Sequence, residues 1–398
     1  MQISEPNQNQ PTTGFVHHPL WQLPFRSFFL VGGLYSTIAL ILWWSLLSGH
    51  LTMPSNTLPS LVWHVHEMIF GFSATIAVGF VLTAVQTWTG KPSIKGLPVA
   101  GLIAVWLVVR FMLWYNTPNS VLGAIILQAS WWIFAIYIYA KLVLSAQNRR
   151  NYLFIPLLSV MAIVNIVMLV SAFSGNDSLA LHLGKSAVLL FTLLMGIVGG
   201  RVIPFFTVRG ANTTAITPNK LIEALLLPIS LLGISVFVIG YFIELPFTPA
   251  VLMITGGILH LTRIVGWRTI STASVPLLWS LHFAYAFIGI GLIALGLSYY
   301  GLGLSFSGAL HLITIGAIGL MIFSMMSRVS LGHTGRALKV KPQIILAFLL
   351  LITAALLRAL LPEFGLVSLA WISSMICWVS AGLLFFITYW PVLSSPRH

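Results

Sequence analysis

Long apolar runs alternate along the chain with short polar breaks. Each run is long enough for a membrane-crossing helix, which needs about 20 predominantly apolar residues. The breaks carry turn-forming residues, as in SGHLTMPSNTLP, YNTPNS and LPEFG. The pattern predicts twelve transmembrane helices, over residues 26–48, 60–86, 96–115, 119–145, 151–173, 178–199, 218–240, 248–266, 274–298, 304–327, 342–361 and 366–390.

The predicted helices leave no stretch long enough for a separate soluble domain. We therefore predict an all-α, polytopic membrane protein with a single transmembrane domain over residues 26–390. Residues 1–25 and 391–398 are predicted to be short cytoplasmic segments. The first of these is polar and lacks a charged n-region and a small-residue cleavage site, which argues against a removable signal peptide.

The composition agrees with a membrane protein. The 398 residues are 58% hydrophobic and 6% charged, and the mean hydropathy is +1.00, whereas a soluble domain carries about 25% charged residues. Cys377 is the single cysteine of the chain. Disulfides, cysteine-ligated zinc and iron–sulfur clusters are therefore excluded.

Positive charges gather in alternate loops, as with Lys91 and Lys95 in one and Arg149 and Arg150 in another. The loops between them lack Lys and Arg, and one of them contains Asp177. By the positive-inside rule, both termini are expected in the cytoplasm. This topology accounts for the net charge of +13, so the lipid bilayer is an expected partner and nucleic acid is not.

Several titratable residues fall inside the predicted helices. An ionised side chain at the bilayer centre costs about 2.5–3.5 kcal/mol on insertion scales, so such residues usually have partners. Counting about 1.5 Å per helical residue from the loops gives each residue a depth. The outer half of the bilayer holds His64, His66, Glu67, Arg110, His182, Lys185, His311 and Arg358; His260 and His282 lie deeper, and His333 follows in a cytoplasmic loop.

Histidines at similar depth on different helices are candidate metal ligands. Neutral imidazole is a common ligand, and within a bilayer it could clamp a haem or copper between helices. The alternative for each is an interhelical hydrogen bond. His64 and His66 are two residues apart, about 200° around a helix, so they are not expected to bind one metal together. The candidate metal ligands are His64, His66, His182, His260, His282, His311 and His333.

The charged residues in the outer half have roles that match a haem. Arg110 and Lys185 could neutralise haem propionates, and the alternative is that they snorkel to the headgroups. For Arg358 snorkelling is the preferred interpretation. Glu67 is a candidate catalytic residue, because a desolvated carboxyl favours its neutral form and can donate protons. It could instead orient the imidazole of His64 or His66.

Six blocks of the sequence carry most of these residues. They are LPFRSFFL (23–30), WHVHEMIFGF with GFVLTAVQTWTG (63–90), WLVVR (106–110), GGRVIPFFT (199–207), LWSLHFAY (278–285) and HLITIGAIGLMIFSMMSRVSLGHTGR (311–336). In this order, and over nearly the whole chain, they resemble the NnrS family. The motif positions include His64, His66, Glu67, Arg110, Arg201, His282, His311, Arg328, His333 and Arg336, whereas His182, Lys185 and His260 lie outside the strongest blocks.

The resemblance implies a twelve-span protein of the bacterial cytoplasmic membrane that contains haem and copper and is linked to nitric oxide metabolism and denitrification. The leading hypothesis is an enzyme that reduces nitric oxide to nitrous oxide with b-type haem. The haem would be bound noncovalently, because the chain has no C-x-x-C-H motif. Electrons would then come from quinol or from an electron-donor protein.

Two other functions remain open on the sequence. One is a non-catalytic nitric oxide sensor or sink that protects against nitrosative stress. The other is a transporter of haem or a metal, which would predict two similar halves with broken helices around a central site. The sequence shows neither feature convincingly. A homodimer is compatible with the sequence.

Overall fold

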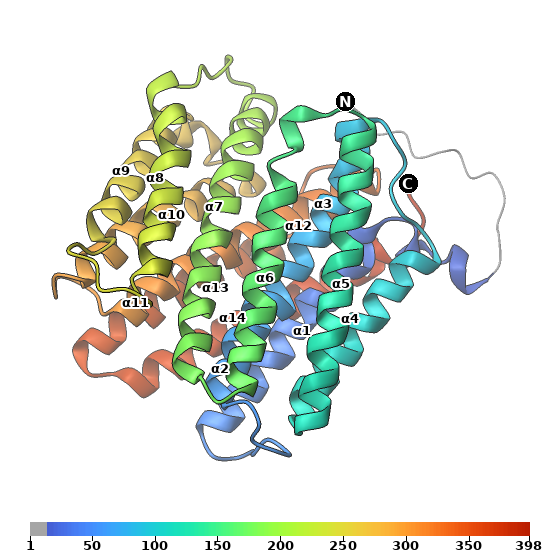
Figure 1. The fold of residues 1–398 in the computed structure, drawn as a ribbon. Helices are drawn as coiled ribbons and strands as arrows, with labels where there is room; N and C mark the ends of the chain where they lie inside the picture. Colours follow the sequence, from blue (N-terminus) through green and yellow to red (C-terminus); the bar gives the residue numbers. More distant parts are fainter. Residues whose placement is uncertain (1–13) are drawn as a thin grey trace. The chain divides into compact units, whose positions relative to one another are not determined.

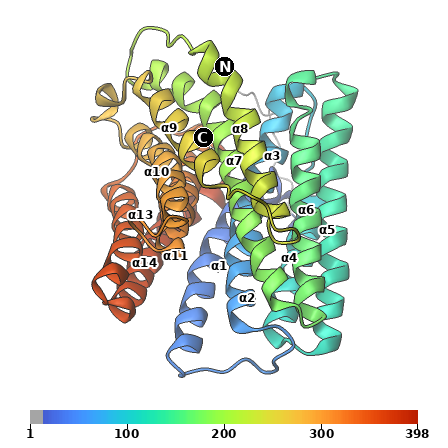
Figure 2. The same cartoon turned by 60° about the vertical axis from the view of Figure 1, so that its left-hand side comes forward.

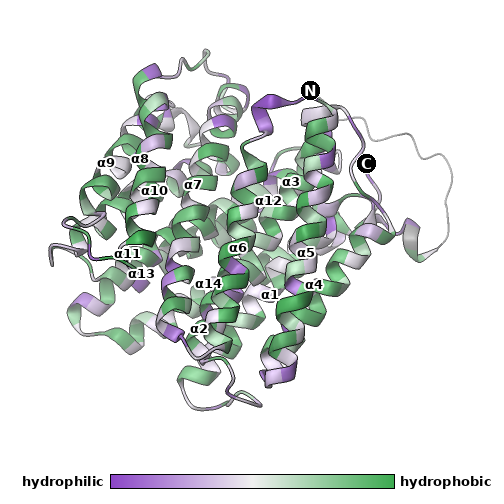
Figure 3. Ribbon diagram, in the orientation of Figure 1, coloured by the Kyte–Doolittle hydropathy of each residue, from purple (hydrophilic) through white to green (hydrophobic). Residues whose placement is uncertain are grey.

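The computed structural model describes residues 14–398 and is built from helices, with no strand in that range (Figure 1). Apolar residues cover most of the helical surface (Figure 3). The chain folds into two compact units. Unit 1 comprises the chain up to Gly184 together with Arg328–Leu338 and Phe386–His398, and unit 2 comprises Lys185–Ser327 and Lys339–Phe385.

Unit 1 contains the first five long helical segments. One of them is a continuous run in which two α-helices flank a π-helix. The segments are α1 (Pro24–Leu47), α2 (Ser60–His66) with the π-helix η3 (Glu67–Ser73) and α3 (Ala74–Thr89), α4 (Leu97–Tyr115), α5 (Pro118–Ser145) and α6 (Phe154–Phe173). The run from α2 to α3 packs along α1. Helix α5 packs against both α4 and α6, and these three helices lie together in Figure 2.

Unit 2 holds most of the remaining helices, and a second π-helix lies among them. Three of these helices, α7, α12 and α14, continue into or out of unit 1. The helices are α7 (Asp177–Gly210), α8 (Lys220–Ile239), α9 (Ala250–Val265), α10 (Pro276–Ser298), α11 (Phe306–His311) with the π-helix η6 (Leu312–Gly319) and α12 (Leu320–His333), α13 (Pro342–Leu360) and α14 (Val367–Leu393).

Glycines set the close approach of α9 and α10. A Cβ atom on Gly257 would lie 2.6 Å from the carbonyl oxygen of Gly289, and a Cβ on Gly296 would lie 2.7 Å from that of Ala250. Both distances are too short for a side chain, so the two backbones touch where glycine permits it. Such small-residue contacts are the usual way in which membrane helices pack closely.

Helix ends follow the local sequence. Pro24, Pro118 and Pro276 each open a helix, where the missing N–H costs no hydrogen bond. Gly90 and Asn116 end α3 and α4 in the left-handed conformation, with φ of 68° and 57°. These signals fix where the membrane segments begin and end.

The predicted all-α fold is confirmed. Eleven helical segments of the described chain are long and apolar enough to cross a membrane, and Ala250–Val265 is a shorter apolar helix. Together they correspond one by one to the twelve predicted runs. The side on which each terminus lies stays a prediction, and the predicted N-terminal segment 1–25 lies partly outside the described residues.

Two predicted boundaries were wrong. The helix predicted over 178–199 continues to Gly210, so Arg201 is helical and not part of a loop. The helix predicted over 304–327 continues to His333, which is therefore the last residue of α12. In α7, Gly199 and Gly200 permit the close approach of neighbouring side chains, since a Cβ on Gly199 would lie 3.0 Å from the Tyr285 ring.

Candidate functional site

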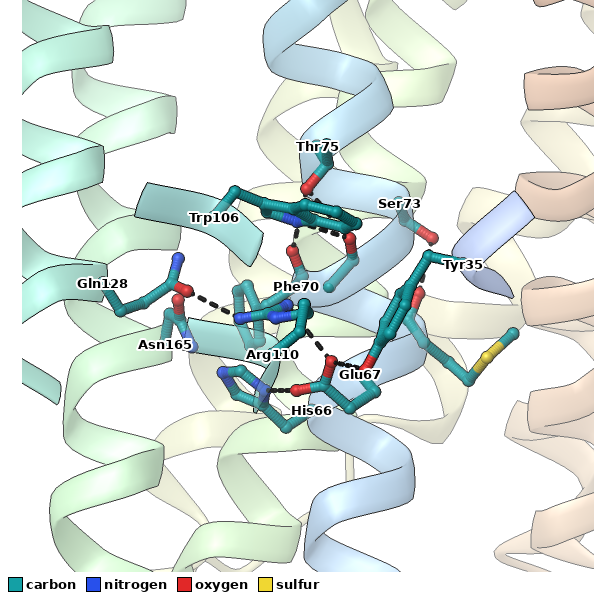
Figure 4. Close-up of polar contacts among 12 residues, drawn as sticks. Tyr35, His66, Glu67, Phe70, Ser73, Thr75, Trp106, Arg110, Gln128 and Asn165 are labelled. Atoms are coloured by element: carbon teal, nitrogen blue, oxygen red, sulfur yellow. Dashed lines mark hydrogen bonds and ion pairs between the residues drawn. The ribbon is translucent and has the colours of Figure 1, made fainter. Parts of the chain in front are cut away.

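A buried polar cluster in unit 1 surrounds the carboxylate of Glu67 (Figure 4). Tyr35 reaches it from α1, Arg110 from α4, and His66 is the residue that precedes Glu67 at the end of α2. Gln128 on α5 lies behind Arg110. The side chains of His66 and Glu67 are 0% exposed and that of Arg110 is 4% exposed. The cluster is therefore closed to solvent and lipid.

Each oxygen of the Glu67 carboxylate has a partner. Oε1 lies 2.7 Å from Nδ1 of His66, and Oε2 accepts a hydrogen bond from the Tyr35 hydroxyl. Nη1 of Arg110 is 3.3 Å from Oε2, and its Nη2 donates to Oε1 of Gln128 at 2.9 Å. One cation and two hydrogen bonds compensate the buried negative charge, which an isolated carboxylate would not tolerate.

The π-helix η3 builds this cluster. It begins at Glu67, directly after His66, and π-helical turns occur frequently at functional sites. Gly71 within it is indispensable, because a Cβ there would lie 2.5 Å from Nη1 of Arg110 and 2.6 Å from Oε2 of Glu67. The carbonyl of Gly71 accepts from Nε1 of Trp106 at 3.0 Å. The wide turn thus makes room for the ion pair beside the backbone.

The hydrogen bond to Glu67 fixes the tautomer of His66. A carboxylate only accepts, so Nδ1 of His66 carries the hydrogen and Nε2 of the neutral ring keeps a lone pair. This Nε2 is buried and finds no hydrogen-bond partner among residues 14–398. A metal-binding histidine typically donates its other nitrogen to a carboxylate in this way. His66 is therefore arranged as a metal ligand.

His64 belongs to a different environment. Its ring stacks on the indole of Trp43 on α1, with centroids 4.4 Å apart and an angle of 11° between the planes. His66 instead contacts Glu67. The two histidines thus have separate contacts, as their spacing predicts, and His64 packs against the Trp43 indole.

His311 in unit 2 repeats the arrangement of His66. It is the last residue of α11, directly before the π-helix η6. Its Nδ1 lies 2.7 Å from the carbonyl oxygen of Ser307, which can only accept, so Nε2 keeps the lone pair. Nearby, Arg358 donates to the Ser307 hydroxyl at 3.3 Å, and the Lys185 ammonium lies 5.3 Å from the Phe306 ring centroid.

His282 has both ring nitrogens engaged. Nε2 lies 2.8 Å from the hydroxyl oxygen of Thr207, which itself donates to the carbonyl of Ile203. Thr207 must therefore accept from Nε2–H, and Nδ1 accepts from the Thr269 hydroxyl at 3.0 Å. Such a ring has no lone pair left for a metal. The structure gives His282 the contacts of an interhelical hydrogen-bonding residue.

His260 lies in a third arrangement, also in unit 2. Its Nδ1 is 2.9 Å from the hydroxyl of Tyr285, and that hydroxyl accepts from Nη1 of Arg263 at 2.8 Å. Arg263 forms a two-point ion pair with Glu223. Arg263 can only donate to this hydroxyl, and Nδ1 of His260 is the acceptor that the hydroxyl contacts within the described residues. We therefore infer that the hydroxyl hydrogen of Tyr285 points to Nδ1 and that Nε2 of His260 carries the remaining hydrogen.

The other predicted ligands have different surroundings. His333 lies with its ring 5.4 Å from that of Phe25, and His182 is half-buried on α7. Within residues 14–398 no group of three or more His, Cys, Asp or Glu side chains is placed to hold a metal ion. His66 and His311 each present one ring nitrogen with a lone pair, which could hold a haem.

Sequence reasoning missed several members of these clusters. Tyr35, Gln128 and Tyr285 are polar but uncharged, so their burial costs less than that of a charged side chain and marks them less clearly in an apolar helix. Glu223 and Arg263 lie near the cytoplasmic ends of the helices predicted over 218–240 and 248–266. The pairing of Glu223 with Arg263 could have been sought, because both lie near the same predicted membrane edge.

These features define a polytopic helical membrane protein with buried, carboxylate-supported histidine. Residues 19–397 match the profile of the family described as NnrS protein. The chain therefore belongs to the NnrS family, as its sequence blocks indicate. No protein with a curated description matches it.

Proposed function

We propose that this protein binds b-type haem and reduces nitric oxide to nitrous oxide in the membrane. The observation that carries the proposal is the buried Nε2 of His66, which has a lone pair, a carboxylate on the opposite nitrogen, and no partner among the described residues. Membership of the NnrS family supports the link to nitric oxide metabolism.

The tautomers of the buried histidines indicate which residues would hold haem. His66 in unit 1 and His311 in unit 2 would each hold haem through Nε2, and Lys185 near His311 could neutralise a propionate. Arg110 is committed to Glu67 and Gln128, so a propionate role no longer suits it. When bound, haem would supply the redox change and the binding position for nitric oxide.

The protein groups would orient the ligand and balance charge. Glu67 holds the His66 ring through Nδ1 and raises the basicity of its Nε2. Arg110 compensates the carboxylate, and Tyr35 fixes its second oxygen. The contacts of Glu67 thus support the orienting role more than proton delivery. The overall reaction takes two molecules of nitric oxide, two electrons and two protons to nitrous oxide and water, with electrons from quinol or a partner protein.

Haem content and nitrous oxide formation test the proposal together. We expect the purified protein to give the pyridine haemochrome of b-type haem and to form nitrous oxide with a reduced quinone analogue. His66→Ala should lose haem, whereas His50→Ala, which changes an exposed loop histidine, should retain it. Well-folded His66→Ala protein with full haem content would contradict the assignment.

A non-catalytic nitric oxide-binding protein is the second candidate. It is favoured by the engagement of Glu67, since the carboxylate beside His66 is held by Tyr35, His66 and Arg110 and is not placed as a proton donor. This candidate predicts a change in the haem spectrum on addition of nitric oxide without nitrous oxide formation. Gas chromatography of the headspace distinguishes the two.

A further inference from the structure

Unit 2 contains a small cavity beside His260. Its volume is about 30 Å³, and side chains from α7, α8, α9 and α10 line it. The wall is mainly apolar, with Leu193, Met253 and Leu292 among its residues. Ser230, Thr192 and His260 are its polar members, and Thr192 donates its hydroxyl to the carbonyl of Val188 at 2.8 Å.

The ring of His260 is held in one orientation at this cavity. The hydroxyl of Tyr285, which accepts from Arg263, engages Nδ1, as described above. On the opposite edge, a Cβ on Gly196 would lie 2.8 Å from Cε1 of the ring and 3.5 Å from Nε2. The guanidinium of Arg263 occupies the space that a side chain at Gly200 would need. The ring can therefore neither turn nor exchange its donor and acceptor nitrogens without breaking the chain to Arg263.

Size and polarity restrict what the cavity can hold. A cavity of about 10–15 Å³ admits one water, and one of roughly 150 Å³ admits benzene. A volume of about 30 Å³ thus suits two or three heavy atoms. Water needs two to four polar partners, whereas the Thr192 hydroxyl is engaged within its own helix, which leaves Ser230 and His260 as the polar groups of the wall. A neutral molecule with one acceptor end matches it better.

The position of the cavity gives such a molecule a route. α8 and α9 expose apolar side chains, including Leu231, Leu232, Val251 and Ile258, where they face the bilayer. Both helices also contribute walls of the cavity. Small neutral gases dissolve better in hydrocarbon than in water, so they would reach the cavity from the lipid.

We propose that the cavity beside His260 is a binding site for a neutral molecule of two or three atoms, hydrogen-bonded through Nε2–H. The Glu223–Arg263–Tyr285 chain positions the donor. The identification of this molecule as nitric oxide rests on the proposed function, but the cavity and its donor do not. The role of His260 is then to bind a gas molecule and not to ligate a metal.

Xenon and nitrous oxide serve as probes that need no turnover. In protein embedded in nanodiscs, hyperpolarised xenon-129 NMR should show a protein-bound resonance distinct from xenon in lipid. Gly256→Val places a side chain in the cavity, where its Cβ would contact Ile229 at 3.8 Å. This variant should lose the resonance. Gly101→Val, at an exposed helical glycine with no atom within 4 Å, is the matched control and should retain it.

The donor is tested by competition. Nitrous oxide should displace xenon from the wild type, and His260→Phe, which keeps a ring but removes the N–H, should weaken this displacement several-fold while xenon still binds. Absence of a protein-bound xenon resonance in the wild type, as a water-filled cavity would give, overturns the proposal. The proposal is also overturned if the bound xenon resonance persists in folded Gly256→Val protein, or if nitrous oxide displaces xenon equally well from His260→Phe and from the wild type. If xenon binds but the protein forms no nitrous oxide, the proposed cavity site stands and only the proposed reductase activity is refuted.

Discussion

His66 and His260 are both buried imidazoles with a hydrogen-bonded Nδ1, yet their partners give them opposite chemistry. Glu67 accepts from Nδ1 of His66 and leaves a lone pair on Nε2. The hydroxyl of Tyr285, which accepts from Arg263, donates to Nδ1 of His260 and leaves a hydrogen on Nε2. The first ring can ligate a metal, and the second can only donate a hydrogen bond. The group bound to Nδ1 thus determines whether Nε2 can bind a metal or donate a hydrogen bond.

The backbone around His66 also differs from that around His260. His66 and His311 each end an α-helix directly before a π-helical segment, whereas His260 and His282 lie inside regular helices α9 and α10. A π-turn widens the helix and changes the direction of the side chains next to it. His66 and His311, the two histidines proposed to bind a metal through Nε2, thus share this position before a π-helix.

Removal of the Glu67 side chain should have the largest effect on stability and haem content. Glu67→Ala leaves the Arg110 cation buried without its carboxylate, a change that typically costs about 3–5 kcal/mol. We expect a large loss of thermal stability in detergent together with loss of haem. Glu223→Ala is the control, since Glu223 is exposed and its loss should be far milder. Equal melting temperatures for wild type and Glu67→Ala would contradict the buried ion pair.

Replacement of the Glu67 carboxylate by an amide should weaken haem binding. Glu67→Gln keeps the shape but removes the charge that orients His66, and loss of such a partner commonly lowers metal affinity about 10–100-fold. Haem titration of the purified variant measures this. Unchanged haem affinity combined with slower nitric oxide consumption would instead assign proton delivery to Glu67.

A methyl group at Gly71 should disturb the same cluster less. The added Cβ would meet Arg110 and Glu67 at about 2.5 Å, and overpacking of this kind costs roughly 1–3 kcal/mol. We expect Gly71→Ala to lower the thermal midpoint and haem retention. Gly101→Ala, in open surroundings, should be neutral or slightly stabilising. If both variants behave alike, the tight packing at η3 is refuted.

The smallest effect is expected at Tyr285. Tyr285→Phe removes the hydroxyl between Arg263 and His260, and a lost buried hydrogen bond costs about 1–3 kcal/mol. Haem content should not change, because His260 is not a ligand in this account. The ring of His260 should gain access to the other tautomer, visible as a changed nitrogen-15 spectrum. Haem loss in this variant would place His260 among the ligands.

The sequence predicted the helices better than the sites. Hydropathy located all twelve helical runs, because the bilayer requires long apolar segments, but it ended α7 at Gly199 and Gly200, whose packing role depends on Tyr285 and Arg263. It identified His66 with Glu67 as a pair. It could not rank the histidines, since the tautomers depend on Ser307, Thr207 and Tyr285, which contact them through the fold.

Nitrogen-15 NMR of the histidine side chains in the purified protein tests the central claim most directly. Substitution of each histidine in turn assigns the resonances of His66 and His260. We predict that Nε2 of His66 carries no hydrogen, whether bare or bound to metal, and that Nε2 of His260 does. A protonated Nε2 on His66, or an unprotonated Nε2 on His260, would contradict the account.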